Sequence, residues 1–389
     1  MRITDIECHI LLVPDVRKDV TSSAQDDIVV CVHTDEGIVG IGETDVNPWI
    51  AKACIEAPGT HTMGLGLKEM LMGEDPLQPE RLWEKLYTGS AMNGRRGAVI
   101  CAMGALDIAL WDICGKAAGK PCWQLLGEQA KPHIVPYASL QPTGDSYEAY
   151  RDSLVAWASR ARELGFTAGK MEVTLSGPYN HSGLDEPDDK ITEIVAACRA
   201  AVGPDFVMMV DVQYTWSDAD VALRTLGEWA DLDIYFVETP LQIDDLEGYA
   251  RLHHRAPMPI AAGEWQTTRF EFAELMDAGM IDVAQPDVGR VGGLTEARRV
   301  CEMAAARNRR IVPHCWKTGI GIAAAAHLAA VTAHCPFIEF LPSELCDSAL
   351  RKELVDDELR LEEGVLALPK KPGLGIEINQ DALKHYRVG

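Results

Sequence analysis

The stretch Phe206-Val-Met-Met-Val-Asp211 is an apolar run that ends in a carboxylate, and the same pattern recurs along the chain as far as Leu341. The runs end in Asp211, Glu238, Glu264, Asp287, His314 and Glu339. Successive members lie between 23 (287 minus 264) and 27 (238 minus 211) residues apart, which leaves room for one strand, one loop and one helix. Strands that alternate with helices pair in parallel through right-handed crossovers. The stretch therefore predicts an α/β barrel that gathers reactive side chains at the carboxyl ends of its strands.

Each of these residues also has a simpler interpretation. A single aspartate at a strand end most often caps the helix that follows it. Six reactive residues in phase are much harder to explain as caps. We therefore expect them to ring one cavity.

Composition limits the class of protein. The chain has 389 residues, a hydrophobic content of 47% and a net charge of −23. The length suits a barrel plus a second domain, and the charge argues against nucleic acid and against an anionic membrane. None of the eleven cysteines forms a CxxC pair, no apolar run reaches the ~18 residues of a membrane span, and the chain opens directly into a strand-like pattern. We expect reduced thiols, a cytoplasmic location and no membrane or nucleic-acid partner.

The first part of the chain has a different pattern. Residues 3–12 read as a strand, and residues 28–43 read as a hairpin with its turn at Glu36-Gly37. Residues 99–116 have the apolar spacing of a buried helix, in which Asp107 and Asp112 are expected to make buried hydrogen bonds. The barrel is predicted to begin near His133, and Lys371 to Ile378 looks like a strand that returns to the N-terminal domain.

Two further groups of residues are candidates for the cavity. Lys170 and Glu172 alternate along a predicted strand and so point the same way, either as an ion pair that fills the barrel mouth or as catalytic groups. Residues 175–189 form a long loop that carries Tyr179, Asn180 and His181, which either contact a substrate or decorate the surface. Gln213, two residues beyond Asp211, is another candidate substrate contact.

The ring of residues suggests a chemistry. Asp211, Glu238 and Glu264 come from consecutive strands and are hard oxygen ligands, which suit Mg²⁺. Asp287 and His314 follow on neighbouring strands, and a carboxylate beside a histidine makes it a general base. A metal beside such a dyad can support removal of a proton from carbon.

These residues resemble the enolase superfamily, mandelate racemase subgroup. The resemblance rests on the six strand-end residues, on Gln285-Pro-Asp287, on Ala105 to Lys116 and on Pro372-Gly-Leu-Gly375, and it covers nearly the whole chain. It implies a modified TIM barrel, (β/α)7β, over residues 129–365, with an N-terminal α+β capping domain over residues 1–128 that residues 366–389 complete. It further implies Mg²⁺ ligation by Asp211, Glu238 and Glu264, a His314–Asp287 dyad, and a hydrogen bond from Glu339 to the substrate carboxylate.

The chain departs from that subgroup at one position. Racemases of the subgroup carry Lys-x-Lys on the second barrel strand, whereas this chain has Lys170-Met171-Glu172. The second lysine base is missing while the His314 side is intact, which is similar to acid-sugar dehydratases of the rhamnonate dehydratase type. Lys170 and Glu172 are expected to pair, which would keep the lysine protonated.

The resemblance implies Mg²⁺-dependent dehydration of a sugar acid, an aldonate or aldarate, to a 2-keto-3-deoxy acid. One alternative is a racemase or epimerase in which Lys170 or Glu172 serves as the second base, and another is a catalytically silent homologue. The expected partners are a small sugar acid and further copies of the same chain.

Overall fold

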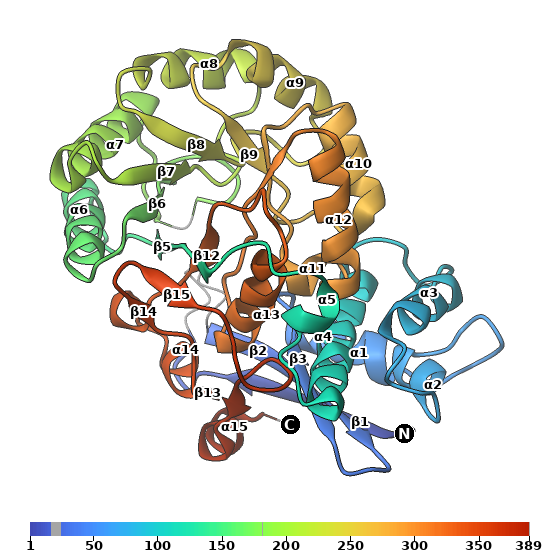
Figure 1. Ribbon diagram of the computed structural model, residues 1–389. Coiled ribbons are helices and arrows are strands. Elements are labelled where there is room, and N and C mark those ends of the chain that lie inside the picture. The colour runs from blue at the N-terminus through green and yellow to red at the C-terminus, as the bar shows by residue number, and fades with distance from the viewer. Residues whose placement is uncertain (17–24, 181, 389) are drawn as a thin grey trace.

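The computed structural model describes residues 1–16, 25–180 and 182–388, and Figure 1 shows two parts packed on each other. The N-terminal part is an antiparallel sheet in the order β1-β2-β3, followed by helices. Its elements are β1 (Ile3–Leu12), β2 (Asp26–Thr34), β3 (Val39–Glu43), α1 (Pro48–Glu56), α2 (Leu67–Leu71), α3 (Pro79–Gly89), α4 (Ala98–Ala118) and α5 (Trp123–Leu126). The predicted strand over residues 3–12 and the predicted hairpin are both confirmed.

The second part is a parallel sheet in which strands and helices alternate. Its elements are β5 (Pro136–Leu140), α6 (Tyr147–Glu163), β6 (Ala168–Glu172), α7 (Asp188–Val202), β7 (Val207–Asp211), α8 (Ala219–Glu228), β8 (Ile234–Glu238), α9 (Leu246–Arg255), β9 (Ile260–Ala262), α10 (Thr268–Asp277), β10 (Val283–Ala284), α11 (Val288–Val291), α12 (Leu294–Ala306), β11 (Arg310–Ile311), α13 (Gly319–Ala330) and β12 (Ile338–Phe340). The helices form the outer layer in Figure 1.

The sheet curls into the predicted (β/α)7β barrel. Eight strands run in the order β11-β10-β9-β8-β7-β6-β5-β12, so the last strand pairs with the first. Across the remaining seam, between the segment after β11 and β12, Glu339 N donates a hydrogen bond of 3.3 Å to Pro313 O. Because all the strands are parallel, their carboxyl ends share one rim.

Helix α4 joins the two parts. It is buried along most of its length, and Gly40 and Gly42 of β3 lie so close to it that a Cβ on either would stand 2.1 or 2.0 Å from a carbonyl oxygen of α4. On another face, a Cβ on Gly104 would stand 2.0 Å from Gly289 O. Close packing of glycines thus presses α4 against the loop that carries Asp287.

The two aspartates of α4 are satisfied as the sequence predicts. Asp107 accepts hydrogen bonds from the backbone N and the hydroxyl of Thr295. Asp112 accepts from Ile41 N, Leu374 N and Lys116 Nζ. Burial raises the pKa of Asp107 to about 7, despite the hydrogen bonds from Thr295. Both residues therefore hold elements together.

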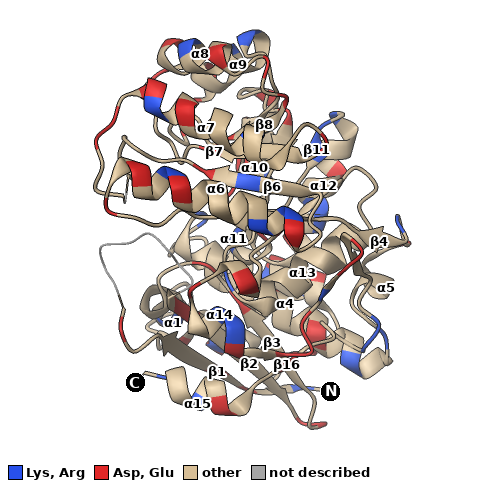
Figure 2. Ribbon diagram, turned by 90° about the vertical axis from the view of Figure 1, so that its left-hand side faces the viewer, with Lys and Arg blue, Asp and Glu red and all other residues tan. Residues whose placement is uncertain are grey.

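By length and composition α4 is also apolar enough to cross a membrane, which corrects the expectation that no segment is long enough. The most apolar window of the helix is 83% buried inside the protein. Its composition is that of a central core helix. Charged residues lie instead on the outer helices, such as α6, α7 and α8 (Figure 2).

The C-terminal segment returns to the N-terminal part as predicted, where Leu374 N donates to Asp112, while its last strand pairs within the segment itself. Its elements are η2 (Ser343–Leu345), α14 (Ala349–Glu353), β13 (Val355–Asp356), β14 (Leu361–Glu362), β15 (Val365–Ala367), β16 (Glu377–Ile378) and α15 (Gln380–Tyr386). β16 pairs with β13, not with the N-terminal sheet. The contact with that sheet comes later, where Val388 N donates to Ile10 O at 2.9 Å. The domain boundaries themselves stay a prediction.

The start of the barrel also differs. His133 lies in β4 (His133–Ile134), which pairs with β15 outside the barrel. The barrel strand begins at Pro136, where a residue without a backbone N–H is tolerated because it opens the strand.

Stability below neutral pH should depend on His327 in α13. Its Nδ1 accepts a hydrogen bond from Trp123 N, its Nε2 contacts Leu374 O at 3.1 Å, and burial lowers its pKa to about 4. The unfolded chain binds a proton near pH 6.5 and the folded chain does not, so stability is lost as the pH falls from about 6.5 to 4. The loss attributable to this group is about 3 kcal/mol.

Urea unfolding at several pH values measures the effect. His327→Gln keeps a donor and an acceptor but cannot titrate, so it should flatten the fall in unfolding free energy. His61→Gln, at an exposed position, should leave the fall unchanged. Parallel curves for wild type and His327→Gln would contradict the assignment.

Candidate active site

The six strand-end residues converge at one end of the barrel. Asp211 and Glu238 close β7 and β8 and are neighbours in register, and Glu339 lies in β12. The other three lie two or three residues beyond the ends of β9, β10 and β11 (264 minus 262, 287 minus 284 and 314 minus 311). All six residues are buried, and none is more than 7% exposed. The ring predicted from the spacing is thus present in the fold.

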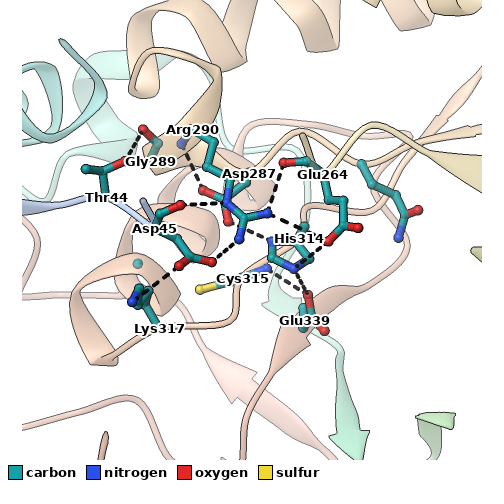
Figure 3. A network of polar contacts seen from close by, with 12 residues as sticks. Thr44, Asp45, Glu264, Asp287, Gly289, Arg290, His314, Cys315, Lys317 and Glu339 are labelled. Carbon is teal, nitrogen blue, oxygen red and sulfur yellow. Dashed lines mark hydrogen bonds and ion pairs between the residues drawn. The ribbon is translucent and has the colours of Figure 1, made fainter. Parts of the chain in front are cut away.

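His314 and Asp287 form a close pair (Figure 3). His314 Nδ1 lies 2.7 Å from Asp287 Oδ2, and Nε2 lies 3.2 Å from Glu264 Oε2. Asp287 Oδ1 accepts a hydrogen bond from Arg290 N at 3.0 Å, so this aspartate also caps α11. Burial opposes the charged imidazole, but Glu339 and Asp287 outweigh it and raise the pKa of His314 to about 9. The cap and the dyad use different oxygens of one side chain.

Glu339 is held by three donors. Ser139 Oγ donates to Oε1 at 2.6 Å, Cys315 N donates to Oε2 at 2.7 Å, and Lys170 Nζ lies 2.9 Å from Oε1. Burial opposes the charge, but Lys170 and His314 outweigh it and lower the pKa of Glu339. Glu339 is therefore a fixed carboxylate beside the dyad.

Lys170 does not form the predicted ion pair with Glu172. Its Nζ lies 2.7 Å from Glu238 Oε1, 2.9 Å from Glu339 Oε1 and 3.6 Å from Asp211 Oδ2. The two side chains share a face of β6, but the lysine extends across the barrel to carboxylates on other strands. Burial opposes its charge, and the carboxylates of Glu238 and Glu339 outweigh it, so the pKa of Lys170 stands well above its ordinary value.

Glu172 has other neighbours. It lies beside Asp211 in the register of β6 and β7, and Gln141 Nε2 donates to its carboxylate at 3.2 Å. The residue is buried. Glu172 lies on the same rim of the barrel as the His314–Asp287 dyad, as the alternation of side chains along the strand predicts. Its role in catalysis stays a prediction.

The proposed metal ligands have the right donor chemistry. Burial and repulsion from Glu238 raise the pKa of Asp211 well above its usual range, and burial raises that of Glu238 even beside Lys170. Several carboxyl groups are crowded around one ammonium, and a hard divalent cation fits such a set of carboxylate oxygens. As they stand, no three His, Cys, Asp or Glu side chains of the described chain are grouped closely enough to hold a metal ion. Lys170 and the Gln285 amide occupy the two oxygens of Glu238.

An aromatic group lies next to Glu264. Tyr214 and Trp265 stack with ring centroids 4.4 Å apart, and Tyr179 stands edge-on to Trp265 at 4.9 Å. Gln213 and Tyr214 both have positive φ, 41° and 59°, a strained conformation that clusters at functional sites. Gln213 N donates to Asp211 Oδ1 at 2.9 Å. Substrate contacts by Tyr179 and Gln213 stay predictions, and His181 lies outside the described residues.

Several residues of the site were not identified from the sequence. Gln285 was interpreted only as part of the Gln285-Pro-Asp287 motif. Five further residues were not singled out: Ser139, Tyr214, Asp45, Arg290 and Lys317. Gln285 could have been found, because it lies two residues before Asp287 in the segment that follows the same strand. Asp45 follows a strand of the other part of the chain, so no local pattern connects it to the barrel.

Family models match both parts of the chain. Residues 10–127 match the mandelate racemase / muconate lactonizing enzyme N-terminal domain, and residues 153–382 match the enolase C-terminal domain-like family. The chain belongs to the enolase superfamily. The family and the barrel fold implied by the resemblance are therefore confirmed.

Several named enzymes are similar to this chain over most of their length. D-galactarolactone cycloisomerase of Agrobacterium fabrum is 31% identical, over 100% of this chain and 99% of that protein. Arabinonate dehydratase of Saccharolobus solfataricus is 32% identical, over 92% and 89%. The crystal structure of 3,6-anhydro-D-galactonate cycloisomerase from Zobellia galactanivorans superposes with a TM-score of 0.87 at 31% identity, over 100% of both chains.

Lys170 should stabilise the folded protein in the absence of metal. Lys170→Met removes the cation shared by three buried carboxylates, which should lower the unfolding free energy by roughly 3–5 kcal/mol. Urea unfolding in the presence of chelator measures this. Glu172→Gln is the matched control, because Glu172 lies on the same strand but is not an ion partner of Lys170, and it should cost clearly less. Equal losses in the two variants would contradict the observed pairing.

Proposed function

We propose that this chain dehydrates a sugar acid, an aldonate or aldarate, to a 2-keto-3-deoxy acid. The observation that carries the proposal is the asymmetry of the site. One general base, His314, is backed by Asp287, while Lys170 is held by three carboxylates. A protonated, fully paired lysine can hold an oxygen but cannot accept a proton.

The residues have distinct tasks in this proposal. His314 takes the α-proton through Nε2, because Nδ1 is engaged by Asp287, which fixes the tautomer and orientation of the ring. Without a metal ion the surrounding carboxylates raise the pKa of His314 to about 9. A cation held by Glu264 would offset part of that negative charge and favour the neutral imidazole that this step requires. Glu339, held by Ser139 and Cys315 N, lies 3.8 Å from His314 Nε2. It can donate the predicted hydrogen bond to the substrate carboxylate only in its protonated form. The imidazolium then returns its proton to the 3-hydroxyl, which leaves as water from the same face.

Asp211, Glu238 and Glu264 would hold Mg²⁺ in this proposal. Such an ion, when bound, stabilises negative charge on a substrate carboxylate. Glu264 Oε2 lies 3.2 Å from His314 Nε2, so a proposed metal ligand is in direct contact with the proposed base.

A second candidate has support from the comparisons. The two cycloisomerases are similar over the full length of this chain. If the substrate were a cyclic sugar acid with its ring oxygen on the β-carbon, the same removal of the α-proton would expel that oxygen instead of water. A racemase would need a second base on the opposite face, which Lys170 is poorly suited to provide.

Metal dependence tests the carboxylate set. Activity on a panel of aldonates, aldarates and their lactones should disappear with chelator and return with Mg²⁺. Glu238→Gln should lose Mg²⁺ binding, measured by calorimetry, while circular dichroism shows a folded chain. Full activity after thorough chelation would contradict the proposal.

The one-base mechanism has a sharper test. His314→Asn should lose product formation by at least about a thousandfold and should also lose exchange of the α-proton in D₂O, followed by NMR on an accepted substrate. Glu172→Gln, the control on the opposite side, should retain measurable turnover. Exchange that persists in His314→Asn would show a second working base, and the racemase alternative would then replace the dehydratase. Release of a ring oxygen instead of water would identify the cycloisomerase.

A further inference from the structure

A cluster of charges connects the N-terminal part of the chain to the dyad (Figure 3). Arg290 lies in α11, three residues after Asp287. Its Nε donates to Asp45 O at 2.9 Å, and its Nη2 contacts the Asp45 carboxylate at Oδ2. Lys317 Nζ lies 3.3 Å from the other oxygen, Asp45 Oδ1. One carboxylate from the N-terminal part thus pairs with two cations of the barrel.

The backbone fixes this arrangement. Asp45 follows β3, and its neighbour Thr44 donates through Oγ1 to Gly289 O at 2.9 Å. Lys317 also binds Asp26, at 2.8 Å to the carboxylate and 2.8 Å to the carbonyl. Burial opposes the charge on Asp45, but Arg290 and Lys317 outweigh it and lower its pKa. Asp45 is therefore a carboxylate held in place from both sides.

Arg290 has a second carboxylate within reach. Its Nη1 donates to Glu264 O at 3.3 Å and lies 3.7 Å from Glu264 Oε2. A guanidinium is permanently charged and binds carboxylates with two parallel hydrogen bonds. If Asp45 did not engage it, the nearest acceptor for its free N–H groups would be Glu264. An arginine bound there would occupy that carboxylate and repel a cation.

We propose that Asp45 is a positioning residue that limits the Arg290 guanidinium to one long contact with the Glu264 carboxylate, at 3.7 Å, and thereby sets the affinity of the barrel for its divalent cation. The inference rests on the proposed function only in that Glu264 is a ligand of that cation. It makes the cation site depend on a side chain of the N-terminal part that never touches the metal. Glu264 is then available to the cation only when the N-terminal part packs against the barrel and Asp45 engages Arg290.

Calorimetric titration of the full chain with MgCl₂, without substrate, tests the proposal. Asp45→Asn should weaken Mg²⁺ binding by roughly tenfold or more, because a buried cation loses its partner. Asp26→Asn is the matched control, since Asp26 binds the same Lys317 but not Arg290, and it should change the affinity less than about twofold. Asp45→Asn combined with Arg290→Gln should recover most of the wild-type affinity.

The outcomes separate the two proposals. If the wild type does not bind Mg²⁺, the proposed metal site is wrong. If the wild type binds and Asp45→Asn binds equally well, or if Arg290→Gln fails to rescue it, the role of Asp45 is wrong. Should Asp45→Asn not fold, Arg290→Gln alone decides. It should bind Mg²⁺ as tightly as the wild type or more tightly, and weaker binding would overturn the proposal.

Discussion

The site depends on the balance between buried carboxylates and the few cations that offset them. Asp211, Glu238 and Glu339 share the ammonium of Lys170, and burial makes each unpaired charge costly. The parallel barrel creates this problem, because it brings the ends of all its strands to one rim. The same concentration of carboxyl groups is the basis of the proposed cation site and of the raised pKa of His314.

The dyad depends on packing that lies outside the barrel. Helix α4 approaches the loop of Asp287 so closely that Gly104 faces Gly289 without room for a side chain. On its other side the same helix accommodates Gly40 and Gly42 of the N-terminal sheet. A change in either contact would move the loop relative to His314, so the small residues of α4 contribute to the geometry of the site without touching it.

The N-terminal part contributes charge as well as cover. Asp45 reaches Arg290 and Lys317, and Glu43 accepts hydrogen bonds from Thr318 and from Gly321 N at the start of α13. These contacts join β3 to segments that directly follow β10 and β11. The two parts of the chain therefore form one electrostatic unit at the rim, and the composition of each part alone does not describe the site.

The sequence by itself determined the barrel, its order and the six residues at the strand ends, because strand and helix periods are local and parallel pairing sends every strand end to the same rim. It also determined that Asp107 and Asp112 are structural, since they lie in an apolar helix. Only the tertiary structure decided the partners of Lys170, the pairing of β16 with β13, and the contact of Asp45 with Arg290. Those outcomes depend on distances between residues far apart in the chain, and a strand's alternation gives the direction of a side chain but not which neighbouring strand it reaches.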